Sequence, residues 1–261
     1  MKNILKLFTI VTLGTTAYAH NLWVKGVNED IFKAEMIYGD HFPNAEKISK
    51  ERETIFEPIK LFSPKAEIPL IQKEEFYRYY ANEKLQDGTY IIKAKYKPTP
   101  WIKNKDGKWE MNKTRKDSQN VKECGVYSML GKSILVVGEN DGEFATKPLG
   151  NEFEITPLVK ASEIKEGVSI KFKVTKDGKP LKFIDVYGSV EGFLGEQHHD
   201  HHNHREGESM AFYSKTDLKG EFVFKALKSG FWYLRADYKK SSNNEDCELI
   251  GDKTTLSFEV K

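Results

Sequence analysis

VSIKFKV, residues 168–174, alternates apolar and polar side chains without a break. The apolar positions, which point to one side of an extended chain, are Val168, Ile170, Phe172 and Val174. The positions between them are serine or lysine. A strict period of two marks a β-strand with one buried face and one face in water. This stretch therefore predicts an antiparallel sheet rather than a helical protein.

The same period recurs along the chain. It appears in residues 30–38, 89–98, 220–224, 231–238 and 255–260. Asp-Gly pairs at 87–88, 106–107 and 177–178 separate strand-like segments, which is typical of hairpins. Helical patterns are scarce, and we expect short helices only near 73–82 and 159–166. Many short strands separated by turns predict an all-β protein built from antiparallel sandwiches.

The chain divides near residues 138–155. This stretch, GENDGEFATKPLGNEFEI, is polar and glycine-rich, and a new series of strands follows it. A chain of 261 residues suits two modest domains or one large one. From the break at 138–155 we expect two antiparallel β-sandwich domains in tandem, at 20–147 and 152–261.

The N-terminus, MKNILKLFTIVTLGTTAYA, has the layout of a secretory signal peptide. Two lysines precede a short apolar segment, and Ala17-Tyr18-Ala19 forms a small-x-small cleavage site. The alternative is an uncleaved membrane anchor, but the apolar segment is short and contains threonines. Cleavage after residue 19 makes His20 the first residue of an exported, periplasmic chain without a transmembrane span. It also takes away two lysines and no acids, so the formal charge of +2 falls to about zero, which argues against a nucleic-acid partner.

Two cysteines, Cys124 and Cys247, stand far apart in the sequence. In an exported protein such a pair forms one disulfide or remains as two free thiols. Neither belongs to a short C-x-x-C motif, which disfavours a thiolate metal site.

Several motifs together resemble a known family. The C-terminal half has a strand, a DGKPL hairpin at 177–181, a second strand and a T-D-x-x-G turn at 216–220. This order resembles an immunoglobulin-like or transthyretin-like module. The N-terminal half carries AHNLWV (19–24), YGDHFP (38–43) and KPTPW (97–101). Over nearly the whole mature chain these motifs resemble the NikM-like periplasmic nickel/cobalt uptake family. The resemblance implies export, β-sandwich domains and a role in transition-metal supply.

A histidine-rich loop spans residues 195–207, GEQHHDHHNHREG. Its five histidines are His198, His199, His201, His202 and His204. Imidazole is a good ligand for zinc, copper, nickel and cobalt. A solvated polar loop is the alternative, but five imidazoles in seven positions favour metal binding.

His20 and His41 are the other candidate metal ligands. After cleavage, the α-amine and Nδ1 of His20 can chelate one ion, as in a histidine brace; the alternative is that His20 only begins a strand. His41 lies in YGDHFP just after a strand and offers a third nitrogen, unless it is a structural histidine. Asp40 is placed to orient it by accepting a hydrogen bond.

These residues predict a metal-binding protein rather than an enzyme. The chain has no G-x-S-x-G elbow and no glycine-rich phosphate loop. We expect it to capture nickel or cobalt, with zinc or copper as alternatives, for a separate membrane transporter. Ligand imidazoles must be neutral, so binding should weaken as the pH falls through about 6.5. The competing hypotheses are a copper-dependent oxidative enzyme and a structural or adhesive module.

Overall fold

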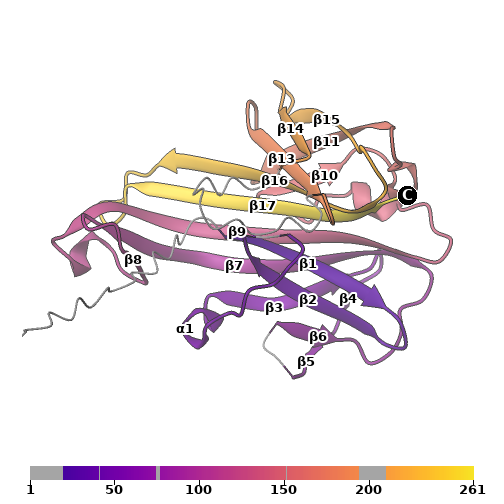
Figure 1. The fold of residues 1–261 in the computed structure, drawn as a ribbon, viewed down its shortest axis with the longest axis horizontal. Coiled ribbons are helices and arrows are strands. Elements are labelled where there is room, and N and C mark those ends of the chain that lie inside the picture. The colour runs from indigo at the N-terminus through magenta and orange to yellow at the C-terminus, as the bar shows by residue number, and fades with distance from the viewer. Residues whose placement is uncertain (1–19, 41, 75–76, 151, 194–209) are drawn as a thin grey trace, which may run out of the picture.

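The computed structural model describes residues 20–40, 42–74, 77–150, 152–193 and 210–261. The expected signal peptide at 1–19 lies outside the described residues, as do His41 and the whole histidine-rich loop at 195–207. These described residues form three β-sheets with a few short helical turns (Figure 1).

The first sheet is built on an N-terminal hairpin. Strand β1 (Asn21–Asn28) pairs with β2 (Phe32–Gly39) along its whole length, from Asn21 opposite Gly39 to Asn28 opposite Phe32. The sheet continues through β6 (Arg78–Tyr80) to β5 (Ile71–Gln72), so β1 is an edge strand.

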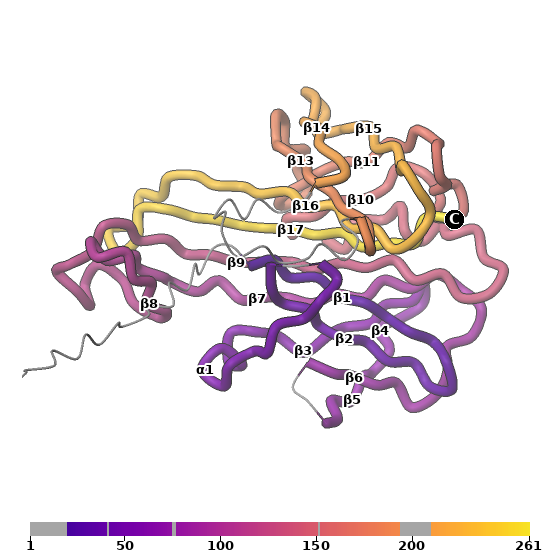
Figure 2. Tube along the Cα trace, in the orientation of Figure 1, coloured from indigo at the N-terminus to yellow at the C-terminus, as the bar shows by residue number. Residues whose placement is uncertain are grey.

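The second and largest sheet has nine strands in the order β14-β13-β16-β17-β9-β7-β3-β4, with β8 paired to β7. Their bounds are β3 (Phe56–Phe62), β4 (Glu67–Ile68), β7 (Gly88–Asn104), β8 (Trp109–Met111), β9 (Val121–Val137), β13 (Asp185–Val190), β14 (Phe212–Lys215), β16 (Gly230–Ser241) and β17 (Leu249–Val260). The C-terminal strand β17 lies beside β9 and parallel to it, as the chain trace in Figure 2 shows. Strands from both sides of the expected domain boundary therefore share one sheet.

The third sheet covers the C-terminal part of the large one. It contains β10 (Glu154–Pro157), β11 (Ser169–Lys176), β12 (Lys179–Pro180) and β15 (Glu221–Lys225). The helical turns are α1 (Lys50–Glu53) and the 3-10 helices η1 (Arg115–Asp117), η2 (Glu143–Thr146) and η3 (Ala161–Glu163). None of these reaches the length needed for an independently stable helix.

The large sheet carries a hydrophobic core on each face. Ile92 of β7 packs with Leu22 and Met36 in the core beneath the first sheet. Its neighbour Ile91 packs with Phe172 and other residues in the core beneath the third sheet. Successive side chains of a strand point to opposite faces, so one strand supplies both cores. The predicted all-β sandwich architecture is confirmed, and the large sheet is the layer that both sandwiches share.

Alternation located the strands well, and local turn signals were less reliable. In β11, Ile170, Phe172 and Val174 are all buried, as their alternation predicts, whereas Val168 precedes the strand and is exposed, so the predicted buried face begins one position too early. The Asp-Gly pairs at 106–107 and 177–178 join antiparallel partners, β7 with β8 and β11 with β12. The prediction for Asp87-Gly88 was wrong, because β6 before it pairs with β2 in the first sheet while β7 after it belongs to the second.

The expected helix near 73–82 was also wrong. Its region contains β6, whose main chain pairs with both β2 and β5. Sheet pairing with distant strands overrides the weak local preference for a helix. Near 159–166 the structure contains only the short turn η3.

A disulfide joins Cys124 of β9 to Cys247, with their Cα atoms 4.7 Å apart. Both cysteines are buried. This settles the open choice between a disulfide and free thiols in favour of the disulfide. Within the described residues, no helix is long and apolar enough to cross a membrane.

Candidate metal centre

His20 stands directly before β1, at the open end of the β1–β2 hairpin. It is the one predicted metal ligand that the described residues include. His41 and the five loop histidines His198, His199, His201, His202 and His204 lie outside them. The surroundings of His20 therefore define the candidate site.

The register of the hairpin brings His20 to Asp40. Asn21 pairs with Gly39, so the next residue on each strand, His20 on one side and Asp40 on the other, continues the same line of partners. Nδ1 of His20 lies 2.7 Å from Oδ1 of Asp40. A separation of twenty residues in sequence thus becomes a direct contact.

Glu46 reaches the same place from the loop after β2. Its main-chain N–H donates to the Tyr38 carbonyl, and its Oε1 accepts from the main-chain N–H of Asp40 at 3.1 Å. A Cβ built on Gly39 would lie 3.0 Å from Cγ and Oε1 of Glu46, so the missing side chain makes room for the carboxylate. The other oxygen, Oε2, lies 3.4 Å from Nε2 of His20.

The resulting His20–Asp40–Glu46 cluster is partly open to water. The side chains of the three residues are 17%, 32% and 47% exposed, respectively. Behind them, the Tyr38 ring lies edge-on to the imidazole at 4.8 Å between centroids. Burial raises the pKa of the Tyr38 phenol above its usual value, and the charges of Tyr96, Asp40 and Glu46 raise it further. The cluster therefore packs against the uncharged Tyr38 phenol on its inner side and is accessible to water on its outer side.

The imidazole of His20 is flanked by an acceptor at each nitrogen. A neutral imidazole carries only one N–H, so it can donate to one carboxylate but not to both. Two carboxylates against one imidazole also give the three side chains an excess of negative charge at neutral pH. Either an imidazolium or a bound cation satisfies this arrangement, and a cation does so without leaving the second carboxylate uncompensated.

The spacing of the donors is close to what a metal ion needs. One donor atom from each of His20, Asp40 and Glu46 can be chosen so that all lie within 4.8 Å of one another. Two ligands at about 2.1 Å from one ion are at most about 4.2 Å apart. A rotation that brings one side chain inward by roughly half an ångström would close the site. The two ring nitrogens point in opposite directions, so one ion would use one of them.

Sequence reasoning found only part of this cluster. His20 was predicted as a ligand, and Asp40 was expected to orient His41, which lies outside the described residues; the contact of Asp40 with His20 was not predicted. Glu46 was not predicted. With 39 acidic residues in the chain, a carboxylate in a loop carries almost no signal. The glycine before Asp40 admits the Glu46 carboxylate because it lacks a side chain, but only the structure shows which carboxylate fills that space.

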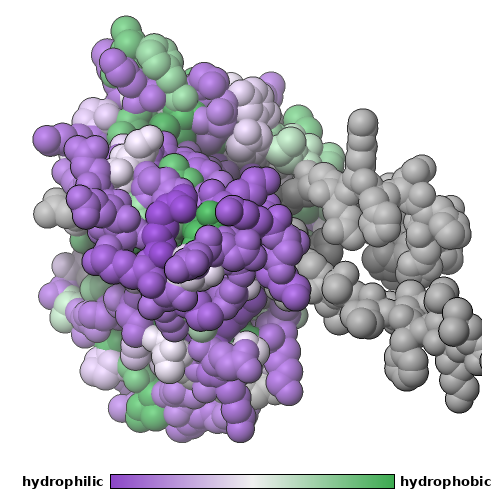
Figure 3. All heavy atoms as spheres, turned by 90° about the vertical axis from the view of Figure 1, so that its left-hand side faces the viewer, coloured by the Kyte–Doolittle hydropathy of each residue, from purple (hydrophilic) through white to green (hydrophobic). Residues whose placement is uncertain are grey.

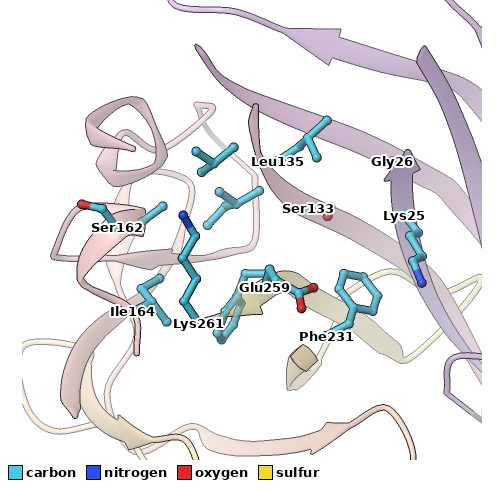
Figure 4. A pocket seen from close by; sticks show the side chains of 13 residues that line it. Lys25, Gly26, Ser133, Leu135, Ser162, Ile164, Phe231, Glu259 and Lys261 are labelled. Atoms are coloured by element: carbon cyan, nitrogen blue, oxygen red, sulfur yellow. The ribbon is translucent and has the colours of Figure 1, made fainter. Parts of the chain in front are cut away.

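A hollow elsewhere on the molecule lacks metal-binding character. It has a volume of about 220 Å³ and lies between β1, β9, η3 and the end of β17. The polar side chains around it include Lys25, Ser133, Glu259 and Lys261 (Figure 4). Burial raises the pKa of Glu259. Among the described residues, no histidine or cysteine lines this hollow, and the lining shares no residue with the His20–Asp40–Glu46 cluster.

The molecular surface also offers little to an apolar partner on the face drawn in Figure 3. Hydrophilic residues dominate that face, and the apolar ones form small scattered groups. Broad apolar patches mark protein or membrane interfaces, whereas scattered apolar residues are normal. The charged His20 cluster is thus the more informative surface feature.

Comparison with known proteins adds a family but no activity. A family described as Domain of unknown function (DUF4198) matches residues 17–240 of the chain. No curated protein matches the chain.

Proposed function

The chain belongs to the DUF4198 family, and we propose that it is a periplasmic protein that binds a divalent transition metal and delivers it to a membrane transporter. Nickel or cobalt is the favoured ion, with zinc or copper as alternatives. The observation that supports this proposal most directly is the convergence of His20, Asp40 and Glu46 at a partly exposed position.

The chemistry of the donors is compatible with these ions. Imidazole is a ligand for zinc, copper and nickel, and carboxylates commonly complete such sites. Calcium and magnesium prefer an all-oxygen shell, so an imidazole at the centre disfavours them. The preference for nickel or cobalt rests on the resemblance of AHNLWV, YGDHFP and KPTPW to the NikM-like uptake family.

Export would add a further ligand. Cleavage after Ala19 gives His20 a free α-amine, which can form a chelate ring with Nδ1. Nδ1 is the ring nitrogen that already faces Asp40 at 2.7 Å, so the amine, Nδ1 and the Asp40 carboxylate would make up three donors. His41 and the loop histidines are further donors in this proposal, with the loop collecting ions and His20 conferring selectivity.

The test is a titration of the untagged mature protein with nickel, cobalt, zinc and copper by calorimetry. Intact mass first establishes whether the chain starts at His20. We expect His20→Ala to weaken the tightest site by about 100-fold or more, since it removes the only described nitrogen donor. Replacing all five loop histidines with alanine should lower the number of bound ions and leave the tightest site in place.

Asp185→Asn is the control for the loss of a polar side chain outside the proposed site. Asp185 is also a half-exposed aspartate, but its partners are Lys215 and Tyr213 rather than histidine. It should leave every affinity unchanged. Equal affinities of the wild type and His20→Ala would rule out the proposed site, and substrate-dependent oxygen consumption by the copper-loaded protein would favour the enzymatic alternative.

A further inference from the structure

The outer edge of β1 is held by side chains of β17. Because β1 is an edge strand, main-chain groups on its free side have no neighbouring strand in the first sheet. The Lys253 ammonium donates to the carbonyl of His20 at 3.0 Å. The Thr255 hydroxyl donates to the carbonyl of Leu22 at 2.5 Å.

The two hydrogen bonds are spaced by the same number of residues on both strands. The donors are two residues apart on β17 and the acceptors two residues apart on β1, which is the repeat that places groups on the same side of a strand. Lys253 and Thr255 are 5% and 1% exposed. Their side chains thus replace a strand at this edge, and they come from the centre of the large sheet, where β17 pairs with both β9 and β16.

From this we infer that Lys253 is a positioning residue for the metal site at His20. The inference rests on the proposed function and extends it to a residue 233 positions away in sequence. Leu22 is already held by the β1–β2 ladder, opposite Tyr38, whereas His20 precedes the first paired residue of β1. Chain ends beyond a ladder fray unless something ties them down. Lys253 ties down the His20 carbonyl itself and so sets the direction from which the imidazole meets Asp40.

The choice of lysine at this position fits the role. A hydrogen bond from a charged donor is stronger than one from a hydroxyl. A nearly buried ammonium is costly to desolvate and needs partners. Thr255 makes the equivalent bond within the paired part of β1 with a neutral group. The charged donor is therefore at the end of the strand, where the ladder gives no support.

The experiment compares three variants of the full mature chain by nickel titration and thermal unfolding. Lys253→Met keeps the apolar stem and removes the donor, and Lys253→Arg keeps a charged donor. Thr255→Val removes the neighbouring bond and is the matched control. We expect Lys253→Met to weaken nickel binding by about tenfold or more, Thr255→Val to change it less than about twofold, and Lys253→Arg to restore most of the affinity.

A purely structural role predicts a different result. Lys253→Met and Thr255→Val would then lower the melting temperature and change nickel affinity in parallel, and this outcome would overturn the inference. So would wild-type affinity in Lys253→Met. Should Lys253→Met fail to fold, Lys253→Gln, which keeps a neutral donor, takes its place in the same comparison.

A second measurement needs no metal. The ¹⁵N NMR signals of the His20 ring report its contact with Asp40 in the metal-free protein. We expect them to change in Lys253→Met and to stay in place in Thr255→Val. If the wild type binds none of nickel, cobalt, zinc and copper, the proposed function fails, and the ring signals alone decide whether Lys253 positions His20. Unchanged ring signals in Lys253→Met would count against the inference.

Discussion

Two charge clusters in this molecule have the same distance between their charged partners but differ in burial and in the groups that surround them. Lys132 of β9 donates to Oε2 of Glu154 of β10 at 2.7 Å, and His20 meets Asp40 at the same distance. The first pair is 1% and 0% exposed, whereas the second is 17% and 32% exposed. Distance alone therefore says little about what a charged pair does.

Both side chains of the Lys132–Glu154 pair form further hydrogen bonds within the protein. Lys132 also donates to the Thr156 hydroxyl at 3.1 Å. The Glu154 carboxylate also accepts from the main-chain N–H groups of Leu149 and Gly150. Burial lowers the pKa of Lys132, and the neighbouring Glu154 partly offsets this. One positive and one negative charge balance, so nothing remains for a ligand.

The His20–Asp40–Glu46 cluster has an excess carboxylate and an open rim. Its single imidazole cannot donate to both acceptors when neutral, and the charges do not balance within the cluster. Charge balance and accessibility, rather than proximity, therefore separate a structural ion pair from a candidate binding site. Four predictions test that distinction.

The largest expected effect is on the buried pair. Lys132→Met leaves the Glu154 carboxylate buried without its cation, so we expect the free energy of unfolding to fall by about 3–5 kcal/mol. Urea unfolding measures this, and nickel affinity should not change. Lys93→Met is the control, because Lys95 also contacts Glu152 and remains in place; we expect a loss below about 1 kcal/mol. Equal losses of unfolding free energy in Lys132→Met and Lys93→Met would contradict the expected importance of the fully buried pair.

The next effect concerns the open cluster. Asp40→Asn keeps the shape of the side chain and removes its charge. We expect nickel binding to weaken by about tenfold, or about 1.4 kcal/mol, while the free energy of unfolding changes by less than about 1 kcal/mol. Calorimetry and urea unfolding of the same samples give both values. A large loss of stability with unchanged affinity would make this cluster structural, like the Lys132–Glu154 pair.

An intermediate case lies near the disulfide. Arg115 contacts both carboxylate oxygens of Glu248, which also accepts from the main-chain N–H of Cys124. The hydrogen bond from Arg115 is the main cause that lowers the pKa of Glu248 to about 2. A lowered carboxyl pKa adds stability above the unfolded value of about 4.5, and this stability disappears as the pH falls towards 2.

Glu248→Gln should therefore lower the free energy of unfolding at pH 7 by about 1 kcal/mol, after discounting for the 40% exposure of the side chain. The difference from the wild type should vanish between pH 4.5 and pH 2. Urea unfolding at several pH values checks this. A difference that persists at pH 2 would mean that lost packing, rather than charge, is responsible.

The smallest effect is expected at an exposed pair. Lys160 and Asp141 are 2.7 Å apart, and their side chains are 44% and 51% exposed. Exposed ion pairs contribute little, because water and salt screen them. Lys160→Met should leave the melting temperature unchanged within error in a calorimetric scan. A clear drop in the melting temperature would show that the exposure of an ion pair does not predict how much it stabilises the fold.

Much of the fold could be predicted from local patterns. Alternation in residues 168–174 and 89–98 located β11 and β7, since each strand records its buried face in contiguous residues. The arrangement of those strands could not be predicted. The parallel pairing of β17 with β9 joins the two halves of the chain in one sheet, and no local signal specifies it.

The candidate site divides in the same way. His20 could be singled out from its position after a predicted cleavage motif, because that signal is local. Glu46 and Lys253 could not, since a carboxylate or an ammonium in a charged chain acquires a role only through its neighbours in space. The Asp40 contact depended on the hairpin register, which becomes certain only when β1 and β2 are seen to pair.

The sequence by itself determined the strand periodicity, the cysteine pair and the histidines that are candidate metal ligands, because these are properties of residue types at short spacings. The tertiary structure decided which strands pair, which charges are balanced in the core, and which carboxylates face His20. Those outcomes depend on contacts between distant segments, such as Lys253 with His20, whose energies exist only after the sheets have packed.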